Sequence, residues 1–85
     1  MQGDDWPVYV PPLIVEVLSP SNTPVKVGRQ RLTAMSAGAQ EFWIVNRDKR
    51  TVEVSRLDSL NTYRLGDAIP LPLFGGSLAV DEIFV

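Results

Sequence analysis

The order of apolar and polar positions divides the first half of the chain into a strand and a helix. Residues 13–18 read LIVEVL, a nearly unbroken apolar and β-branched run, which is typical of a strand covered on both faces. Thr23 is a good N-cap residue, and it directly precedes Pro24, which suits the first helical position. We therefore predict a helix from Pro24 to Ala37, closed by Gly38.

The predicted helix is amphipathic. At 100° per residue, one side collects apolar or small side chains, namely Val25, Gly28, Leu32 and Met35. The opposite side is polar and largely basic, with Lys26, Arg29, Gln30, Thr33 and Ala37. We expect the first side to pack on the sheet and the second to face solvent.

Two further strands follow the helix and form a predicted hairpin. Residues 41–46, EFWIVN, and residues 50–57, RTVEVSRL, are strand-like runs joined by a polar turn at 47–49. Val52 and Val54 alternate with polar side chains, which indicates a strand with one face toward solvent, whereas the first run reads as buried.

The remaining segments carry weaker patterns. A short third strand is expected around 62–65 after a turn at 58–61, and the Pro- and Gly-rich stretch 70–76 reads as a loop. One helical turn is expected at 80–84, and residues 1–11 read as an irregular lead-in or an edge strand. The predicted fold class is α+β: a central sheet with a hairpin or meander and one main flanking helix, in a single domain spanning 1–85.

The composition is that of a small globular domain. The chain has 85 residues, of which 45% are hydrophobic and 21% are charged, so we expect a packed core. It contains no cysteine, which excludes disulfides and thiolate metal sites. A domain of this size without disulfide or metal cross-links depends for its stability on its core or on a partner, and we expect a homo-oligomer.

Charge and residue usage exclude several classes of function. The absence of histidine removes the commonest general base and the Ser-His and Cys-His nucleophile pairs. A formal net charge of −2 does not indicate nucleic-acid binding by the whole surface, although a local basic stripe can still bind DNA. No apolar run reaches the length of about 20 residues that a membrane span needs, and the N-terminus lacks the basic start of a signal peptide. We expect a cytoplasmic protein without a membrane partner.

Glu16 is the candidate functional acid. It lies in the apolar strand, with Ile14 and Leu18 as its neighbours on the same face. A buried carboxylate is costly unless a cation or several donors accompany it. Glu16 is therefore a metal ligand, or an acid at a strand end near the surface, or the partner of a helix base in a structural ion pair. The basic helix residues Lys26, Arg29 and Arg31 either contact phosphates or are simply solvated.

Three segments in a fixed order carry a family resemblance: LIVEVLSPSNT at 13–23, AGAQEFWIVN at 37–46 and RTVEVSRL at 50–57. Their order and spacing, with the basic helix between the first two, resemble the Uma2 family of restriction-endonuclease-like proteins, within the PD-(D/E)XK nuclease superfamily. The resemblance is good over about 11–57 and looser through the tail. It implies a mixed sheet flanked by helices, with acids from adjacent strands and a helix lysine around a divalent metal, and hydrolysis of a DNA phosphodiester.

The resemblance places the strand glutamate of the family at Glu16. Where the family usually has an aspartate four residues earlier, this chain has Pro12, and the helix lysine of the family falls on Gln30. Lys26 lies one turn before Gln30 on the same side of the helix, although a lysine there meets the positive end of the helix dipole. An earlier strand of the family, with its own acid, has no counterpart, so the chain is expected to be the C-terminal portion of the fold.

Two hypotheses follow from the resemblance. In the first, the chain is a DNA endonuclease in which Glu16 binds Mg²⁺ and the basic helix residues named above hold phosphate. In the second, it is a catalytically silent scaffold without a cofactor, which works by pairing with itself or as a protein-interaction module. Pro12 and Gln30 favour the second hypothesis, and the apolar edge of the 13–18 strand, deprived of its neighbour, favours self-association.

Overall fold

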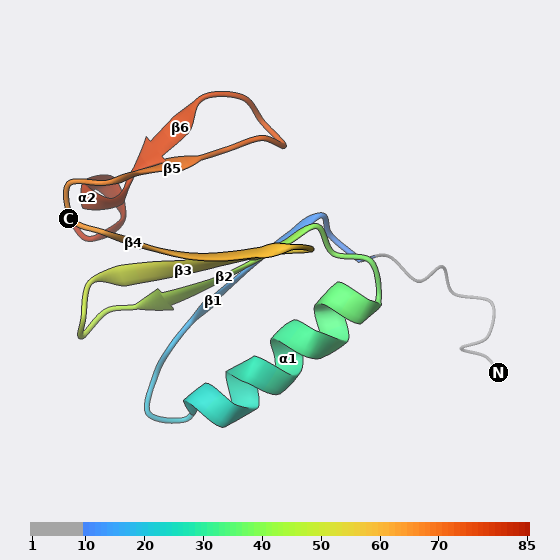
Figure 1. Ribbon diagram of the computed structural model, residues 1–85. Coiled ribbons are helices and arrows are strands. Elements are labelled where there is room, and N and C mark those ends of the chain that lie inside the picture. The colour runs from blue at the N-terminus through green and yellow to red at the C-terminus, as the bar shows by residue number, and fades with distance from the viewer. Residues whose placement is uncertain (1–9) are drawn as a thin grey trace, which may run out of the picture.

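The computed structural model describes residues 10–85, so most of the lead-in predicted for 1–11 lies outside the described residues. A four-stranded sheet forms the middle layer, α1 lies on one side of it, and the β5–β6 hairpin with α2 lies on the other (Figure 1). The elements in chain order are β1 (Leu13–Val17), α1 (Pro24–Ser36), β2 (Glu41–Asn46), β3 (Thr51–Arg56), β4 (Ser59–Arg64), β5 (Ala68–Pro70), β6 (Ser77–Ala79) and α2 (Val80–Ile83).

The sheet is mixed and its order is β1-β2-β3-β4. β1 runs parallel to β2, because α1 carries the chain back to the start of the sheet between them. β2, β3 and β4 form an antiparallel meander. The predicted α+β class, the mixed sheet, the hairpin and the single main flanking helix are therefore confirmed.

The main core lies on the side of the sheet that faces the β5–β6 hairpin. Alternate side chains of β2 and β3 meet residues of the C-terminal hairpin and α2 there, and the buried members are Trp43, Val45, Val52, Val54, Ile69 and Val80. A second, smaller layer forms under α1, where Phe42 and Val27 are almost completely buried. The two layers use opposite faces of the same strands, as the period of two requires.

Helix α1 begins and ends where the sequence predicts. Thr23 is the N-cap, and its Oγ1 accepts a hydrogen bond from the Lys26 amide at 3.2 Å. Pro24 opens the helix, Ala37 is the C-cap, and Gly38 follows with φ of 113°, a conformation that favours glycine. The predicted bounds and caps are confirmed.

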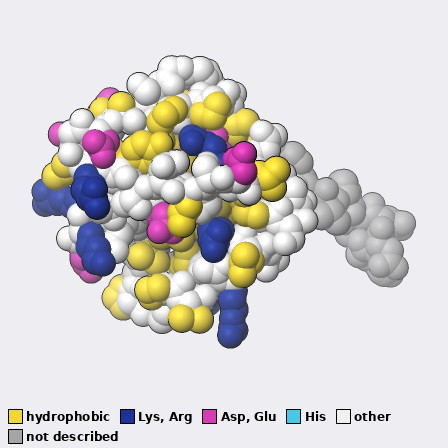
Figure 2. All heavy atoms as spheres, in the orientation of Figure 1, with side chains coloured by type: hydrophobic (Ala, Val, Ile, Leu, Met, Phe, Trp, Pro, Cys, Tyr) yellow, Lys and Arg dark blue, Asp and Glu magenta, His cyan; other side chains and the backbone are white. Residues whose placement is uncertain are grey.

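The predicted apolar face of α1 is wrong for two of its four residues. Val25 and Leu32, which were expected to pack on the sheet, are 70% and 60% exposed, and the buried side chain is Val27. Gly28 and Met35 are half-buried, as is Arg31, so the helix is rotated by part of a turn from the predicted orientation. Apolar side chains accordingly lie on the surface beside Lys and Arg over α1 (Figure 2).

The prediction that β1 is covered on both faces is also wrong. β1 is an edge strand of the described sheet, and Val15 and Val17 on its hairpin-side face are 48% and 42% exposed. An apolar, β-branched run is found in central strands and in edge strands. Its composition therefore does not show whether a strand is buried unless the neighbouring strands are known.

The second half of the sheet is longer than the sequence predicts. β4 begins at Ser59 directly after a two-residue turn, not after a turn at 58–61, and Ser55 of β3 is 2% exposed although its face was expected to be solvated. The predicted loop at 70–76 is confirmed apart from Pro70, and the short strands β5 and β6 that flank it were not predicted, whereas the predicted C-terminal helical turn is confirmed as α2. Neither helix of the described chain has the length and apolar character that a membrane span requires.

Candidate functional site

The side chain of Glu16 lies on the face of β1 that is turned toward α1. Its neighbours on that face are Ile14 and Leu18 along the strand, and Ile44 stands directly opposite on β2. Glu16 is half-buried, because β1 lies at the sheet edge. The carboxylate is therefore bordered on the sheet by apolar side chains alone.

No described cation neutralises Glu16. The ion pair found between described residues joins Arg56 to Glu41 on the opposite face of the sheet, and no side-chain hydrogen bond within residues 10–85 reaches the Glu16 carboxylate. A structural ion pair with a base of α1 is thus not formed among these residues. The position agrees with an acid near the surface at a strand end, and the role of metal ligand stays a prediction.

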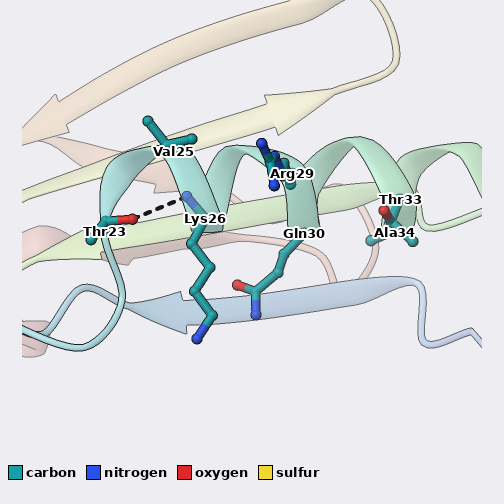
Figure 3. A pocket seen from close by; sticks show the side chains of 7 residues that line it. All are labelled: Thr23, Val25, Lys26, Arg29, Gln30, Thr33 and Ala34. Atoms are coloured by element: carbon teal, nitrogen blue, oxygen red, sulfur yellow. Dashed lines mark hydrogen bonds between the residues drawn. The ribbon is translucent and has the colours of Figure 1, made fainter.

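Lys26 and Gln30 lie on one side of α1, one turn apart, as the sequence predicts. Both line a shallow groove along the helix, and Figure 3 shows them pointing to the side of the strand drawn in the colour of β1, whereas Val25 and Arg29 point away from it. The end of α1 that lies nearest the 19–23 turn thus turns an ammonium and a neutral amide toward the β1 side.

Arg29 and Arg31, both expected to hold phosphate, lie in different grooves. Arg29 lines the groove of Lys26 and Gln30, whereas Arg31 lines a second groove, with a volume of about 710 Å³, between α1 and the uncovered faces of β3 and β4. The fold therefore does not bring the two guanidinium groups together. Other polar residues in the second groove, which sequence reasoning did not single out, are Lys49, Arg64, Glu53, Thr51 and Thr62.

Glu53 is the acid nearest to Glu16 in the sheet register. Ile44 pairs with Glu16 on one side and with Glu53 on the other, so both carboxylates share the α1-facing side of the sheet. Two strand spacings separate their Cα atoms by roughly 10 Å, and the Ile44 side chain stands between them. The predicted hairpin of residues 41–46 and 50–57 could have identified Glu53, because its turn fixes which residues lie opposite each other.

Pro12 serves the backbone at the start of β1. Its carbonyl accepts hydrogen bonds from the amides of Gln40 and Glu41, both at 2.9 Å. Along an extended strand, position 12 lies about 13 Å from Glu16, since each residue advances the chain by about 3.3 Å. An acid at position 12 would thus contribute to a different part of a site and would not share one ion with Glu16.

The oxygen donors around Glu16 do not fit a Mg²⁺ ion. Such an ion takes six ligands in near-octahedral geometry and is usually held by more than one carboxylate or phosphate oxygen. Residues 10–85 contain no group of three His, Cys, Asp or Glu side chains that could hold a metal, and Glu16 has apolar neighbours on three sides. No chemical step of this chain is therefore assigned to a metal ion.

A mixed sheet with a flanking helix and an acid on the edge strand agrees with the restriction-endonuclease-like fold that the sequence resemblance implies. The sequence matches the profile of Uma2, described as "Putative restriction endonuclease", over residues 3–81. The match covers nearly the whole chain, and the chain belongs to the Uma2 family.

One solved structure is similar to most of this chain. It is described as a "putative nuclease belonging to DUF820" from Anabaena variabilis, with a TM-score of 0.80 and 26% sequence identity. The match covers 91% of this chain but 45% of the Anabaena chain, so this chain spans less than half the length of that protein. The comparison with curated proteins gives no match.

Proposed function

We propose that this chain supplies the sheet-and-helix scaffold of the Uma2 fold and does not by itself hydrolyse DNA. The surroundings of Glu16 carry the proposal: Ile14, Leu18 and Ile44 border the carboxylate, and residues 10–85 hold no group of three His, Cys, Asp or Glu side chains that could bind an ion. A lone acid in that position lacks the oxygen ligands that a catalytic divalent cation needs.

The residue at the lysine position of the family supports the same proposal. Hydrolysis of a phosphodiester builds negative charge on the phosphoryl oxygens, and a fixed cation stabilises that charge in the transition state. Gln30 presents a neutral amide, which donates hydrogen bonds but does not neutralise charge. Replacing the cation with an amide therefore removes stabilisation of the transition state of phosphodiester hydrolysis.

Lys26 is a poor substitute for that cation. It lies in the first turn of α1, where the N–H groups already carry partial positive charge. Its side chain is exposed, so water screens its attraction for a phosphate near β1. The ammonium shares a groove with Gln30, yet it stands a full helical turn from the position that the family uses.

A metal-dependent endonuclease is the second candidate function. Glu16, Lys26 and Gln30 all lie toward the β1 side of α1, which is the arrangement that such a site needs in outline. The Anabaena protein has more than twice the matched length, so further ligands and a cation would have to come from polypeptide other than residues 10–85. In that case, this chain would hold one part of the site.

Plasmid cleavage tests the proposal. Supercoiled DNA is incubated with the purified chain and Mg²⁺ or Mn²⁺, and we expect no nicked or linear product above the buffer control. Isothermal titration with Mg²⁺ should give no binding heat. Cation-dependent cleavage that disappears in Glu16→Gln would overturn the proposal, because this substitution preserves the shape of the side chain and removes its charge and one acceptor oxygen.

A gain-of-function variant checks the assigned cause. Gln30→Lys restores the cation in the groove that Gln30 lines with Lys26. If this position limits phosphate binding, the variant should bind phosphate or DNA more tightly than the parent chain at low salt. Gln30→Glu is the matched control, since it adds a charge of the wrong sign at the same place.

A further inference from the structure

The outer edge of β1 is complementary to itself, and we propose that two copies of this chain pair through it in an antiparallel manner with Val15 at the two-fold axis. The result is a continuous sheet of two subunits, with both α1 helices on one side and both β5–β6 hairpins on the other. This pairing does not depend on whether the chain hydrolyses DNA.

The direction of the β1 backbone groups follows from two hydrogen bonds. The Leu18 amide donates to the Val45 carbonyl at 2.9 Å, and the Glu41 amide donates to the Pro12 carbonyl at 2.9 Å. Even-numbered positions of β1 therefore direct their N–H and C=O groups toward β2. By alternation, the N–H and C=O groups of Leu13, Val15 and Val17 point to the outer edge, where no described strand pairs with them.

These outward groups satisfy one another when a second copy is placed antiparallel. With Val15 opposite Val15 of the second copy, each of the two donates to and accepts from the other. Leu13 then lies opposite Val17 of the second copy, and Val17 opposite Leu13 of the second copy. Every outward N–H and C=O of the three residues gains a partner, so the unpaired edge is completely used.

The side chains on this edge favour the same contact. Val15 and Val17 are half-exposed, and together with Leu13 they present no charge on the hairpin-side face of β1, although protected edges usually carry one. An apolar groove of about 440 Å³ adjoins them, with Val45, Ile83, Phe84 and Val85 in its lining and two arginines beside them. In the antiparallel register, Leu13 of the second copy stands beside Val17 on this face and covers the edge of the groove.

Cysteine cross-linking tests the register, because the chain contains no cysteine. Residues facing each other in a hydrogen-bonded antiparallel pair have Cα atoms about 5.5 Å apart, which is within the range of a disulfide. Val15→Cys is thus expected to give a disulfide dimer under mild oxidation. Val17→Cys is the matched control: two such residues would lie about 13 Å apart along the sheet, too far to bridge.

Sedimentation of the unmodified chain completes the test. We expect a dimer at micromolar concentration, and Val15→Lys should raise its dissociation constant at least roughly tenfold, since the axis brings the two ammonium groups together. The proposal is overturned if the chain is a monomer at millimolar concentration, as it would be if its own residues 1–9 or another protein covered the edge. A dimer in which Val17→Cys cross-links as readily as Val15→Cys would also overturn it.

Discussion

Glu41 is the most deeply buried charged side chain of the described residues, with 3% exposure. Its Oε1 accepts a hydrogen bond from the Trp43 indole at 3.0 Å and lies 3.4 Å from an Arg56 guanidinium nitrogen. Arg56 also donates to the Pro70 carbonyl at 3.1 Å. One carboxylate thus connects β2 and β3 to the C-terminal hairpin through an arginine, and its burial is balanced by these partners.

Removing this carboxylate should cost much of the stability of the domain. In Glu41→Ala the indole N–H loses its acceptor and the guanidinium loses its counter-charge, so we expect the free energy of unfolding to fall by about 2–4 kcal/mol. Urea unfolding followed by tryptophan fluorescence measures the loss. Glu82→Ala, at an exposed acid of α2, is the control and should change stability by less than about 0.5 kcal/mol. A Glu41 effect no larger than the control would contradict this account.

Sequence reasoning identified Glu16 as the unusual acid and overlooked Glu41, and the sheet register explains both outcomes. An acid within an apolar run is conspicuous, whereas Glu41 stands at the start of a strand and resembles a terminal polar residue. Its burial depends on Trp43, two residues later on the same face, and on Arg56 across the hairpin. The partners of a side chain follow from pairing register, which a single sequence leaves open.

For α1, the sequence predicts the residue range of the helix correctly but its orientation about the helix axis incorrectly. Val25 and Leu32 are seven residues apart and form one apolar stripe, while Val27 and Ala34 form another with the same spacing. The stripes lie on different sides, so the pattern alone supports two orientations. The sheet selects the second, because Val27 packs into the buried layer with Phe42. Strands β2 and β3 had long, distinct patterns and were predicted well.

The orientation of α1 makes a prediction about two valines. Val27→Ala should lower the free energy of unfolding by about 2 kcal/mol, because it removes buried methyl groups and leaves a cavity. Val25→Ala, the same change two residues away, should alter stability by less than about 0.5 kcal/mol, since that side chain is exposed. Urea titrations at one fixed protein concentration compare the two. Equal losses would indicate that the predicted face, and not the observed one, meets the sheet.

The glycines of α1 and its C-terminus should respond in opposite directions to alanine. A Cβ at Gly28 meets no atom within 4 Å, so Gly28→Ala should stabilise the domain by about 0.5–1 kcal/mol through helix propensity. Gly38 has φ of 113°, where a Cβ is strained, and Gly38→Ala should cost about 1 kcal/mol or more. Melting temperatures by circular dichroism give the sign of each change. Stabilisation at both positions would refute the backbone account of Gly38.

The C-terminal hairpin marks where pattern reading fails for whole elements. β5 and β6 have three residues each and are surrounded by Pro and Gly, too short for a period of two to be visible. Yet Ile69 and Val80 from this region are fully buried against β2 and β3. The tail therefore completes the core, and the identity of Ile69 as a core residue could only come from the fold.

At the scale of the whole molecule, the order of the described strands determines which strand has an unpaired edge. The family resemblance implied a mixed sheet, and the composition of residues 13–18 placed β1 in the interior, because nothing in a run such as LIVEVL reports its neighbour. The same apolar run on an edge strand exposes backbone groups that pair with a strand of another chain. The position of one strand thus gives the expected self-association a specific surface, the outer edge of β1.

Association through β1 links thermal stability to protein concentration. If the folded dimer unfolds to two chains, mass action makes the melting temperature rise with concentration, by roughly 3–5 °C for each tenfold increase in a domain of this size. The melting temperature of Val15→Lys should be lower and depend less on concentration in the lower part of the range, because its charge opposes pairing while leaving the inward hydrogen bonds of β1 intact. Calorimetry over a hundredfold range of concentration distinguishes the two behaviours. A constant melting temperature for the unmodified chain would mean that β1 contributes its edge to no second copy.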